Sequence, residues 1–405
     1  SQATLDKLDG GCAVGHNRYS TAGSASAGDA QPVFAKYKLG EISVVHNGNL
    51  INKNEVRSEL IDRGAIFQTD MDTENIIHLI AKSQKDSLVD RIKDMLTKIE
   101  GAYCLAIQSR SKMFVIRDRF GIRPLSLGKL SDGGYIVASE TCAFDLVGAE
   151  FIRDVEPGEM LTFEEGKEPV SEQIFTPDFH PCAFEYIYFA RPDSTFYGQN
   201  VYLTRKAHGR CLAQEAPVEA DFVMPFPDSG TYAALGYSEA SGIPFEMGMI
   251  RNHYVGRTFI QPTQSMRDFG VRIKLNPVKK LLEGKDIIII EDSIIRGTTV
   301  RTRVKALREL GVRKVHMRVS GPPHRFPCHY GIDFSTRGEL IATRKTVEEL
   351  RDFLGLDSLY YLSIDGLLNA TEIKSGYGET ALLLNVKKGD FGSAYGEIRF
   401  RKGYQ

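Results

Sequence analysis

The run KDIIIIEDSIIRGTTVRTRVKAL, residues 285–307, constrains the fold more than any other part of the chain. Four consecutive isoleucines are typical of a strand that is buried on both faces of a parallel sheet. The residues that follow the glycine have the spacing of a helix. Strands and helices alternate in this way from about residue 180 to residue 345. The sequence therefore predicts an α/β unit in which helices cover a parallel sheet.

The loop between this strand and this helix has the residue types of a phosphate site. The carboxyl end of a parallel strand and the start of a helix together present backbone N–H groups and the positive end of the helix dipole to an anion. Gly297 lets the backbone approach a phosphate, and the hydroxyls of Ser293, Thr298 and Thr299 can donate further hydrogen bonds. The run is not a Walker A loop, which requires G-x-x-x-x-G-K followed by Ser or Thr.

Two acids, Glu291 and Asp292, stand at the end of the predicted strand. Because carboxylates repel phosphate, we predict that they hold ribose hydroxyls and a Mg²⁺ ion that is partly coordinated by water. An ordinary buried strand before a capped helix is the alternative, but the acids, the glycine and the hydroxyls coincide. The run resembles the phosphoribosyl pyrophosphate (PRPP) signature of the type I phosphoribosyltransferases, and this resemblance adds Arg296 to the expected PRPP-binding residues.

A second loop, FPDSG at residues 226–230, also lies between an apolar strand and a helix, where it can present N–H groups to pyrophosphate. On its own it is more typical of a plain turn. Because it precedes the PRPP signature by one strand-and-helix unit, we predict that Asp228, Ser229 and Gly230 bind PRPP. Ser229 would then join Glu291 and Asp292 around Mg²⁺.

The segment between the two loops, residues 251–278, is rich in Arg and Lys and has no clean period. We predict a loop that closes over pyrophosphate, with Arg257 and Lys274 stabilising the charge of the leaving group. A solvated charged surface is the alternative.

The first half of the chain has a different pattern. Up to about residue 165, short β-like runs alternate with turns, and DTENIIHLIAKSQ has helical spacing, which predicts stacked sheets flanked by helices. A Pro-rich stretch, FTPDFHPC, follows. We predict domains at residues 1–175 and 176–345, and a helical segment with a tail at 346–405.

Motifs in this first half closely resemble the glutaminase domain of the N-terminal-nucleophile (Ntn) amidotransferases. They are GHNRYSTAG, VVHNGNL, TDMDTE, RDRFGIRPLSLG and ASETCAFD. With EDSIIRGTT behind them, residues 1 to about 370 resemble the amidophosphoribosyltransferases, the glutamine PRPP amidotransferase family. The resemblance implies an αββα glutaminase domain, here without its N-terminal strand, before a type I phosphoribosyltransferase domain.

The implied reaction is the first step of de novo purine synthesis. PRPP, glutamine (or ammonia) and water would give 5-phosphoribosylamine, glutamate and pyrophosphate. The resemblance also implies a homo-oligomer, dimer or tetramer, with purine nucleotides as feedback inhibitors.

Four residues take roles in the glutamine site by this resemblance. Arg18 would hold the α-carboxylate of glutamine and Asp72 its ammonium group. Asn47 and the backbone N–H of Gly48 would form the oxyanion hole. Without the resemblance, Asn-Gly is more typical of a hairpin turn.

The sequence departs from the family at the nucleophile. The family has a cysteine at its mature N-terminus, several dozen residues before GHNRYST, whereas this sequence begins with Ser1 a short way upstream. Cys12 is predicted to be a buried structural thiol in an apolar strand. We therefore expect the chain as written to lack glutaminase activity, and its second site to use ammonia directly.

One subgroup of the family carries a [4Fe-4S] cluster, which needs four thiolate ligands. Cys182 and Cys328 stand at two of the ligand positions, but the C-x-x-C pair expected near the C-terminus is not found. The resemblance therefore leaves a cluster with only two of its ligands.

The composition argues against binding to nucleic acid or to membranes, and it bears on the cellular compartment. Lys and Arg (51) balance Asp and Glu (52), so no overall charge draws the chain to nucleic acid or to an acidic membrane. Six scattered cysteines and no long apolar run favour the reducing cytoplasm.

Two alternatives to the assigned reaction stay open. A hexosamine-phosphate synthase would share the glutaminase half but would lack EDSIIRGTT. A regulator that binds PRPP or nucleotides without turnover is the other.

Overall fold

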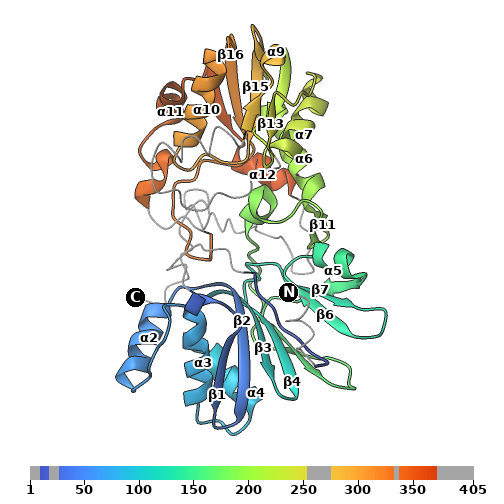
Figure 1. The fold of residues 1–405 in the computed structure, drawn as a ribbon, viewed down its shortest axis with the longest axis vertical. Helices are drawn as coiled ribbons and strands as arrows, with labels where there is room; N and C mark the ends of the chain where they lie inside the picture. Colours follow the sequence, from blue (N-terminus) through green and yellow to red (C-terminus); the bar gives the residue numbers. More distant parts are fainter. Residues whose placement is uncertain (1–9, 18–26, 253–274, 333–336, 372–405) are drawn as a thin grey trace. The chain divides into compact units, whose positions relative to one another are not determined.

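The computed structural model describes residues 10–17, 27–252, 275–332 and 337–371, and divides into two compact units (Figure 1). Unit 1 comprises residues 1–139, 143–181 and 328–335, and unit 2 comprises residues 140–142, 182–327 and 336–405. The sequence placed the boundary between the first two domains near residue 175. Local patterns do not reveal that residues 328–335 return to unit 1, because that return depends on contacts far apart in the chain.

A six-stranded antiparallel sheet, in the order β1-β2-β3-β4-β8-β9, forms the centre of unit 1. Successive side chains of a strand point to opposite faces. Along β3, Tyr103, Leu105 and Ile107 join one apolar cluster, whereas Cys104 joins another. The central sheet is therefore buried on both sides. Its strands are β1 (Val33–Tyr37), β2 (Gly40–Leu50), β3 (Gly101–Ser109), β4 (Lys112–Arg117), β8 (Glu159–Glu164) and β9 (Val170–Gln173).

Helices cover one face of this sheet, and a second sheet covers the other. Ile76 and Ile80 of α3 pack into the first cluster, while Leu127 of β5 and Val155 pack against Val115 and Leu161 in the second. The αββα architecture predicted for this half is confirmed. The flanking elements are η1 (Ala27–Asp29), α2 (Lys53–Asp62), α3 (Asp72–Lys82), α4 (Leu88–Leu96), β5 (Ser126–Lys129), β6 (Tyr135–Ala138), α5 (Cys142–Val147) and β7 (Glu150–Asp154).

Unit 2 is built on a parallel sheet in the order β12-β15-β16-β17. The run of isoleucines predicted as a buried strand forms β15, in which Ile287 to Glu291 are all buried. The sequence placed residues after 345 outside this domain, but β17 is the fourth strand of the sheet. A four-residue strand after a glycine was too short to recognise by pattern. The strands are β12 (Phe222–Pro225), β15 (Asp286–Glu291), β16 (Lys314–Val319) and β17 (Ser358–Tyr361).

The winding of the chain reverses beside β12. After α7 the chain returns to the outer side of β12, where Phe245 bridges Val223 in parallel, whereas α10 leads from β15 to β16 on the other side. Because such crossovers are right-handed, α7 and α10 cover opposite faces of the sheet, as Figure 1 shows. Ligands of open parallel sheets bind at the carboxyl ends of the strands at such a switch point. In unit 2 this point lies between β12 and β15.

Two glycines allow the helices of one face to pack closely. A Cβ atom on Gly209 would lie 1.9 Å from the carbonyl oxygen of Ala233, and one on Gly236 would lie 1.9 Å from that of Lys206. The remaining elements of unit 2 are η2 (Glu185–Phe189), β10 (Thr195–Phe196), β11 (Gln199–Asn200), α6 (Val201–Glu215), α7 (Thr231–Ser241), β13 (Met249–Arg251), β14 (Leu275–Pro277), α9 (Lys279–Leu282), α10 (Thr298–Glu309), η3 (Arg337–Glu339), η4 (Ile341–Thr343), α11 (Val347–Leu354) and α12 (Ile364–Ala370).

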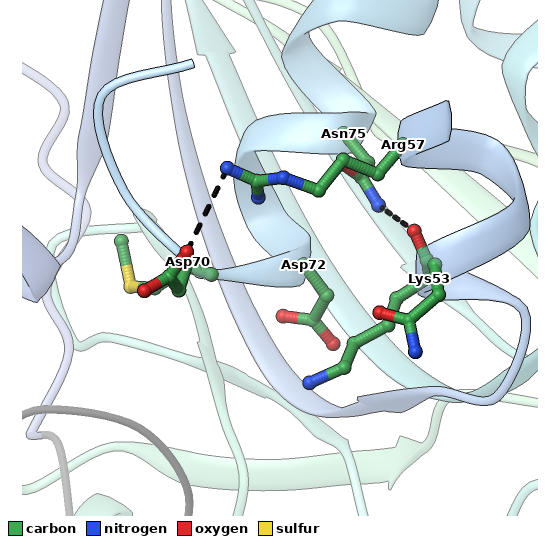
Figure 2. Close-up of a pocket in the computed structure, with 7 residues that line it drawn as sticks. Lys53, Arg57, Asp70, Asp72 and Asn75 are labelled. Carbon is green, nitrogen blue, oxygen red and sulfur yellow. Dashed lines mark hydrogen bonds and ion pairs between the residues drawn. The ribbon is translucent and has the colours of Figure 1, made fainter. Parts of the chain in front are cut away.

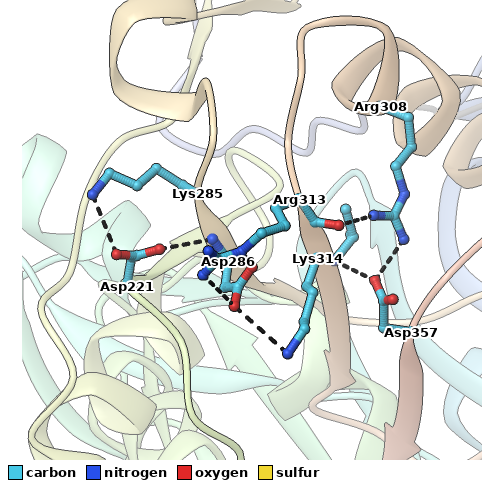
Figure 3. Close-up of polar contacts among 8 residues, drawn as sticks. Asp221, Lys285, Asp286, Arg308, Arg313, Lys314 and Asp357 are labelled. Carbon is cyan, nitrogen blue, oxygen red and sulfur yellow. Dashed lines mark hydrogen bonds and ion pairs between the residues drawn. The ribbon is translucent and has the colours of Figure 1, made fainter.

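Ion pairs join the amino ends of the parallel strands (Figure 3). Arg313 donates two hydrogen bonds to Asp286, at 2.6 and 2.8 Å. Asp357 accepts from Arg308 and from the backbone N–H of Val315, the latter at 2.7 Å. Since these side chains are partly solvated, each pair contributes little to stability. They link neighbouring strands at the end of the sheet opposite the switch point.

One prediction about a thiol is wrong. Cys12 is exposed and lies outside any strand, and its carbonyl oxygen accepts a hydrogen bond from Gln108. Three apolar residues between glycines were too short a pattern to specify a buried strand. Across the described residues, no helix is long and apolar enough to cross a bilayer.

The buried strand supplies a test of the core of unit 2. Ile289→Ala removes most of a fully buried side chain, and we expect it to lower the free energy of unfolding by about 2–5 kcal/mol. Ile250→Ala, at a residue that is 44% exposed, is the matched control and should change it by less than about 1 kcal/mol. Urea denaturation followed by circular dichroism measures both. Equal effects would contradict the burial of β15.

Candidate functional site

Two loops meet at the switch point of unit 2. The backbone N–H of Phe226 donates to the carbonyl oxygen of Ile290 at 2.9 Å, and Ser229 Oγ donates to Glu291 Oε1 at 3.2 Å. Gly230 lies so close to β15 that a Cβ atom would come within 2.1 Å of the same Ile290 oxygen. The glycine of FPDSG is therefore required by close packing, and the two predicted PRPP loops lie side by side.

The acid pair is buried at the end of β15. Glu291 and Asp292 are each only 6% exposed. Burial raises the pKa of Glu291 well above its ordinary value, and the adjacent Asp292 raises this pKa further. The Arg303 guanidinium, with its Nη1 atom 3.7 Å from Glu291 Oε2, opposes this shift. A cation or a set of hydroxyl donors would relieve the repulsion between the two acids.

The start of α10 has the geometry expected of an anion site. Gly297 immediately precedes the helix with a φ of +73°, a left-handed conformation that favours glycine. Thr298 and Thr299 follow in the first turn and are exposed, and N–H groups of a first turn have no acceptor within the helix. Two charged residues that were predicted to bind PRPP have partners within the protein. Arg296, just before α10, donates to Glu339 at 2.9 Å, and Asp228, in the loop before α7, pairs with Arg251.

The donor set fits Mg²⁺. Ser229, Glu291 and Asp292 offer only oxygen atoms, which Mg²⁺ prefers, and the repulsion around Glu291 provides a reason for a cation to bind. Among the described residues there is no group of three or more His, Cys, Asp or Glu side chains that could hold a metal ion. The other ligands of Mg²⁺ would come from substrate and water.

In unit 1, the Asn-Gly pair lies within strand β2. Asn47 pairs with Cys104 and Gly48 with Tyr103 in the antiparallel ladder, so the hairpin turn typical of this dipeptide is not formed. Gly48 has a φ of +144°, and a Cβ atom there would lie 2.0 Å from the carbonyl oxygen of Ala102. Asn47 Nδ2 donates to Ser139 Oγ at 3.3 Å.

Asp72 lies at the start of α3 and contacts the same strand. Its Oδ2 atom accepts from the backbone N–H of Leu50 at 2.9 Å, and its Oδ1 atom lies 3.3 Å from Nδ1 of His46. Burial by itself raises the pKa of Asp72, but the charge and hydrogen bond of His46 and the Leu50 N–H outweigh it and lower this pKa. The carboxylate is therefore ionised and held on β2.

A cavity of about 250 Å³ lies beside Asp72 (Figure 2). Arg57 of α2 reaches across it toward Asp70, with 3.9 Å between Nη2 and Oδ1, and Asn75 Nδ2 donates to the carbonyl oxygen of Lys53 at 2.8 Å. The cavity thus offers both signs of charge beside an ionised carboxylate, as a zwitterionic ligand requires. Its lining residues are Lys53, Asn54, Arg57, Asp70, Met71, Asp72 and Asn75.

Comparisons with known proteins relate both units to one family. A family model described as a glutamine amidotransferase domain matches residues 16–145. Amidophosphoribosyltransferase of Bacillus subtilis is 49% identical over 367 residues, which cover 90% of this chain and 76% of that protein. The chloroplastic amidophosphoribosyltransferase 1 of Arabidopsis thaliana is 48% identical over 369 residues, which cover 91% of this chain.

A solved structure agrees with these sequences. The B. subtilis glutamine PRPP amidotransferase in complex with ADP and GMP superposes with a TM-score of 0.86 at 46% identity, and the match covers 93% of this chain and 82% of that one. This chain belongs to the amidophosphoribosyltransferase family. It spans 65% of the length of the Arabidopsis relative.

Three of the predicted site residues are not among those that the structure describes. Arg18, Arg257 and Lys274 lie outside the described residues. Of the two predicted remnant cluster ligands, Cys182 is buried in unit 2, and Cys328 in unit 1 accepts a hydrogen bond through Sγ from the backbone N–H of Tyr330 at 3.4 Å.

Sequence reasoning missed two residues beside the sites. His46 was quoted within VVHNGNL without a role, although a histidine next to Asn-Gly in an apolar strand was a usable signal. Arg303 lies in the second turn of α10, and no role was assigned to it from the sequence. The structure places Arg303 over the ring of Phe226 at 4.9 Å, next to Glu291.

The close approach at Gly48 is testable with a control on the same strand. Gly48→Ala forces a Cβ atom into the Ala102 carbonyl, and we expect it to lower the free energy of unfolding of unit 1 by about 2 kcal/mol or more beyond Gly40→Ala. Gly40 also has a positive φ, +117°, but open space around its Cβ position. Thermal unfolding followed by circular dichroism compares the two. Equal losses would mean that backbone strain alone, and not packing against β3, requires Gly48.

Proposed function

We propose that this chain transfers the phosphoribosyl group of PRPP to ammonia, with glutamine or free ammonia as the nitrogen source. The products would be 5-phosphoribosylamine and pyrophosphate, and also glutamate when glutamine is the donor, in the first step of de novo purine synthesis. The observation that carries the proposal is the buried pair Glu291 and Asp292 at the switch point of unit 2, beside Ser229. Family membership supports it independently.

Each part of the PRPP site has a physical task in this proposal. The first turn of α10, with Thr298 and Thr299, binds the 5′-phosphate through N–H and hydroxyl groups. Glu291 and Asp292 accept hydrogen bonds from the ribose hydroxyls and so hold C1 in place for attack.

The leaving pyrophosphate needs cations and N–H donors. The loop at residues 226–230 offers its backbone N–H groups at the start of α7, and Arg251 offsets the charge of Asp228. Mg²⁺, held by Ser229, Glu291 and Asp292, would neutralise the developing charge. The predicted roles of Arg257 and Lys274 in closing the site follow from their charge alone.

The glutamine site is proposed for unit 1. Asp72 accepts hydrogen bonds from the ammonium group of glutamine, and Arg18 pairs with the carboxylate. In an enzyme with the family's N-terminal cysteine, Asn47 Nδ2 and the N–H of Gly48 would stabilise the oxyanion that forms when the cysteine thiolate adds to the amide carbon of glutamine, before ammonia leaves. The cavity beside Asp72, with its mixed charges, supports a zwitterionic amino acid as the ligand.

We propose the inhibitors and the oligomeric state of this chain by analogy with its family. Because the B. subtilis relative was solved with ADP and GMP, we propose purine nucleotides of this kind as feedback inhibitors of this chain. We also propose a homo-oligomer, a dimer or a tetramer, which sedimentation in the presence of these nucleotides would measure.

The phosphoribosyl half can be tested without glutamine. With ammonium chloride as nitrogen donor, the wild-type chain should release pyrophosphate from PRPP and Mg²⁺. Asp292→Asn removes a buried charged acceptor, and we expect it to weaken PRPP binding about tenfold or more, as measured by calorimetry.

Asp352→Asn is the control, because Asp352 lies on the exposed side of α11 and pairs with Arg351. It should leave binding and turnover unchanged. Binding of PRPP without any pyrophosphate release would instead favour the non-catalytic regulator. Undiminished PRPP binding by Asp292→Asn would contradict the proposed site.

A further inference from the structure

His46 is enclosed between Asp72 and the neighbouring strand β3. It lies on β2 directly before Asn47, and its side chain is only 1% exposed. One ring nitrogen, Nδ1, lies 3.3 Å from Asp72 Oδ1, and the other, Nε2, lies 3.3 Å from the carbonyl oxygen of Ala102. Both ring nitrogens therefore face oxygen atoms.

These two partners determine how many protons the ring needs. A carbonyl oxygen only accepts hydrogen bonds, and so does a carboxylate, whereas a neutral imidazole has a single N–H donor. A neutral ring would leave one lone pair facing an oxygen lone pair in a buried site. An imidazolium donates to both, so the geometry is satisfied by the doubly protonated ring.

The proton could instead reside on Asp72, but the surroundings favour the carboxylate. Asp72 Oδ2 already accepts from the N–H of Leu50, and the positive charge of Lys53 also acts on this carboxylate. The negative charge of Asp118 raises the pKa of His46 and so also favours the protonated ring. Burial lowers the pKa of His46, but Asp72, the Ala102 carbonyl and Asp118 outweigh burial, and this pKa is raised.

We propose that His46 is a permanent imidazolium that positions Asp72 for the ammonium group of glutamine. The inference rests on the proposed glutamine site of unit 1. With Oδ1 bound to His46 and Oδ2 to the backbone of β2, the carboxylate has one orientation and keeps its full charge beside the cavity. An unpaired carboxylate at this depth would be costly to keep ionised.

His46 also lies beneath the proposed oxyanion hole. A Cβ atom on Gly48 would come within 3.0 Å of His46 Nε2, so the ring packs directly against this glycine. Gln31 holds the backbone of His46 from the other side, since the N–H of His46 donates to Oε1 at 2.7 Å and Nε2 of Gln31 donates to the His46 carbonyl at 3.3 Å. One side chain thus connects the ammonium site with the oxyanion site.

The protonation state is directly measurable. In the chain labelled with ¹⁵N-histidine, long-range ¹H–¹⁵N spectra should show both ring nitrogens of His46 protonated at pH 7.5, and titration only above the ordinary histidine range. Asp72→Asn removes the charge with little change of shape and should return the ring to a neutral tautomer at that pH. A neutral His46 in the wild-type chain would overturn the proposal.

The positioning role is measured by glutamine binding. We expect His46→Gln to raise the dissociation constant for glutamine about tenfold, because Asp72 loses a charged hydrogen-bond partner. His78→Gln, on the same helix as Asp72 but beside Glu74, is the matched control and should bind glutamine as the wild type does. If His46→Gln fails to fold, Asp72→Asn with its ring spectrum carries the test. Equal glutamine affinities of the wild type and a folded His46→Gln would overturn the positioning role.

A different result would count against the proposed function. If the wild-type chain released no pyrophosphate with ammonium as donor, the reaction assigned to unit 2 would fail, whereas the proton count of His46 would be unaffected.

Discussion

Unit 2 depends on placing two carboxyl groups at the buried end of an apolar strand. Four isoleucines supply the burial that fixes β15 in the middle of the sheet, and Glu291 and Asp292 then have to tolerate the low dielectric that this burial creates. Burial and the neighbouring Asp292 therefore raise the pKa of Glu291. Arg303 opposes this shift in part, and substrate hydroxyls and Mg²⁺ are the groups that would oppose the rest.

The buried acid of unit 1 differs from that of unit 2, because protein groups keep the carboxylate of Asp72 ionised. Asp72 has an imidazole and a backbone N–H as fixed partners, and its pKa is lowered where that of Glu291 is raised. In the proposed glutamine site, constant charge would favour binding of an ammonium group. In the proposed Mg²⁺ site, an acid without full hydrogen-bond partners would favour binding of a divalent cation. The two sites differ in this respect although both acids lie beside β-strand ends.

Both units contain a glycine at which two backbone segments approach each other closely. Gly230 brings the first loop of unit 2 against β15, and Gly48 brings β2 against β3. In each case a Cβ atom would collide with a backbone carbonyl, which cannot move as a flexible side chain can. The glycines in the motifs therefore have a packing role in addition to any contact with substrate.

Much of the fold could be predicted from local pattern. The alternation of strand and helix specified the parallel sheet of unit 2, and the short β-like runs specified stacked sheets in unit 1. Pattern failed where elements were short. The strand β17 was assigned to a separate C-terminal helical segment, and Cys12 was placed in a buried strand that does not form. Segments of three or four residues contain too few side chains to define a period.

For the sites, the sequence by itself determined which residue types are available and their order along the chain. It identified Glu291 and Asp292 because two acids at the end of an apolar run are chemically conspicuous, and it identified Asp72 through the resemblance to the Ntn amidotransferases. Only the tertiary structure decided which groups meet. The contacts of His46 with Asp72 and of Ser229 with Glu291 join residues that are far apart in sequence, and the first of them lowers the pKa of Asp72. Electrostatic shifts depend on burial and on partners brought together by folding, and neither quantity is contained in a local stretch of residues.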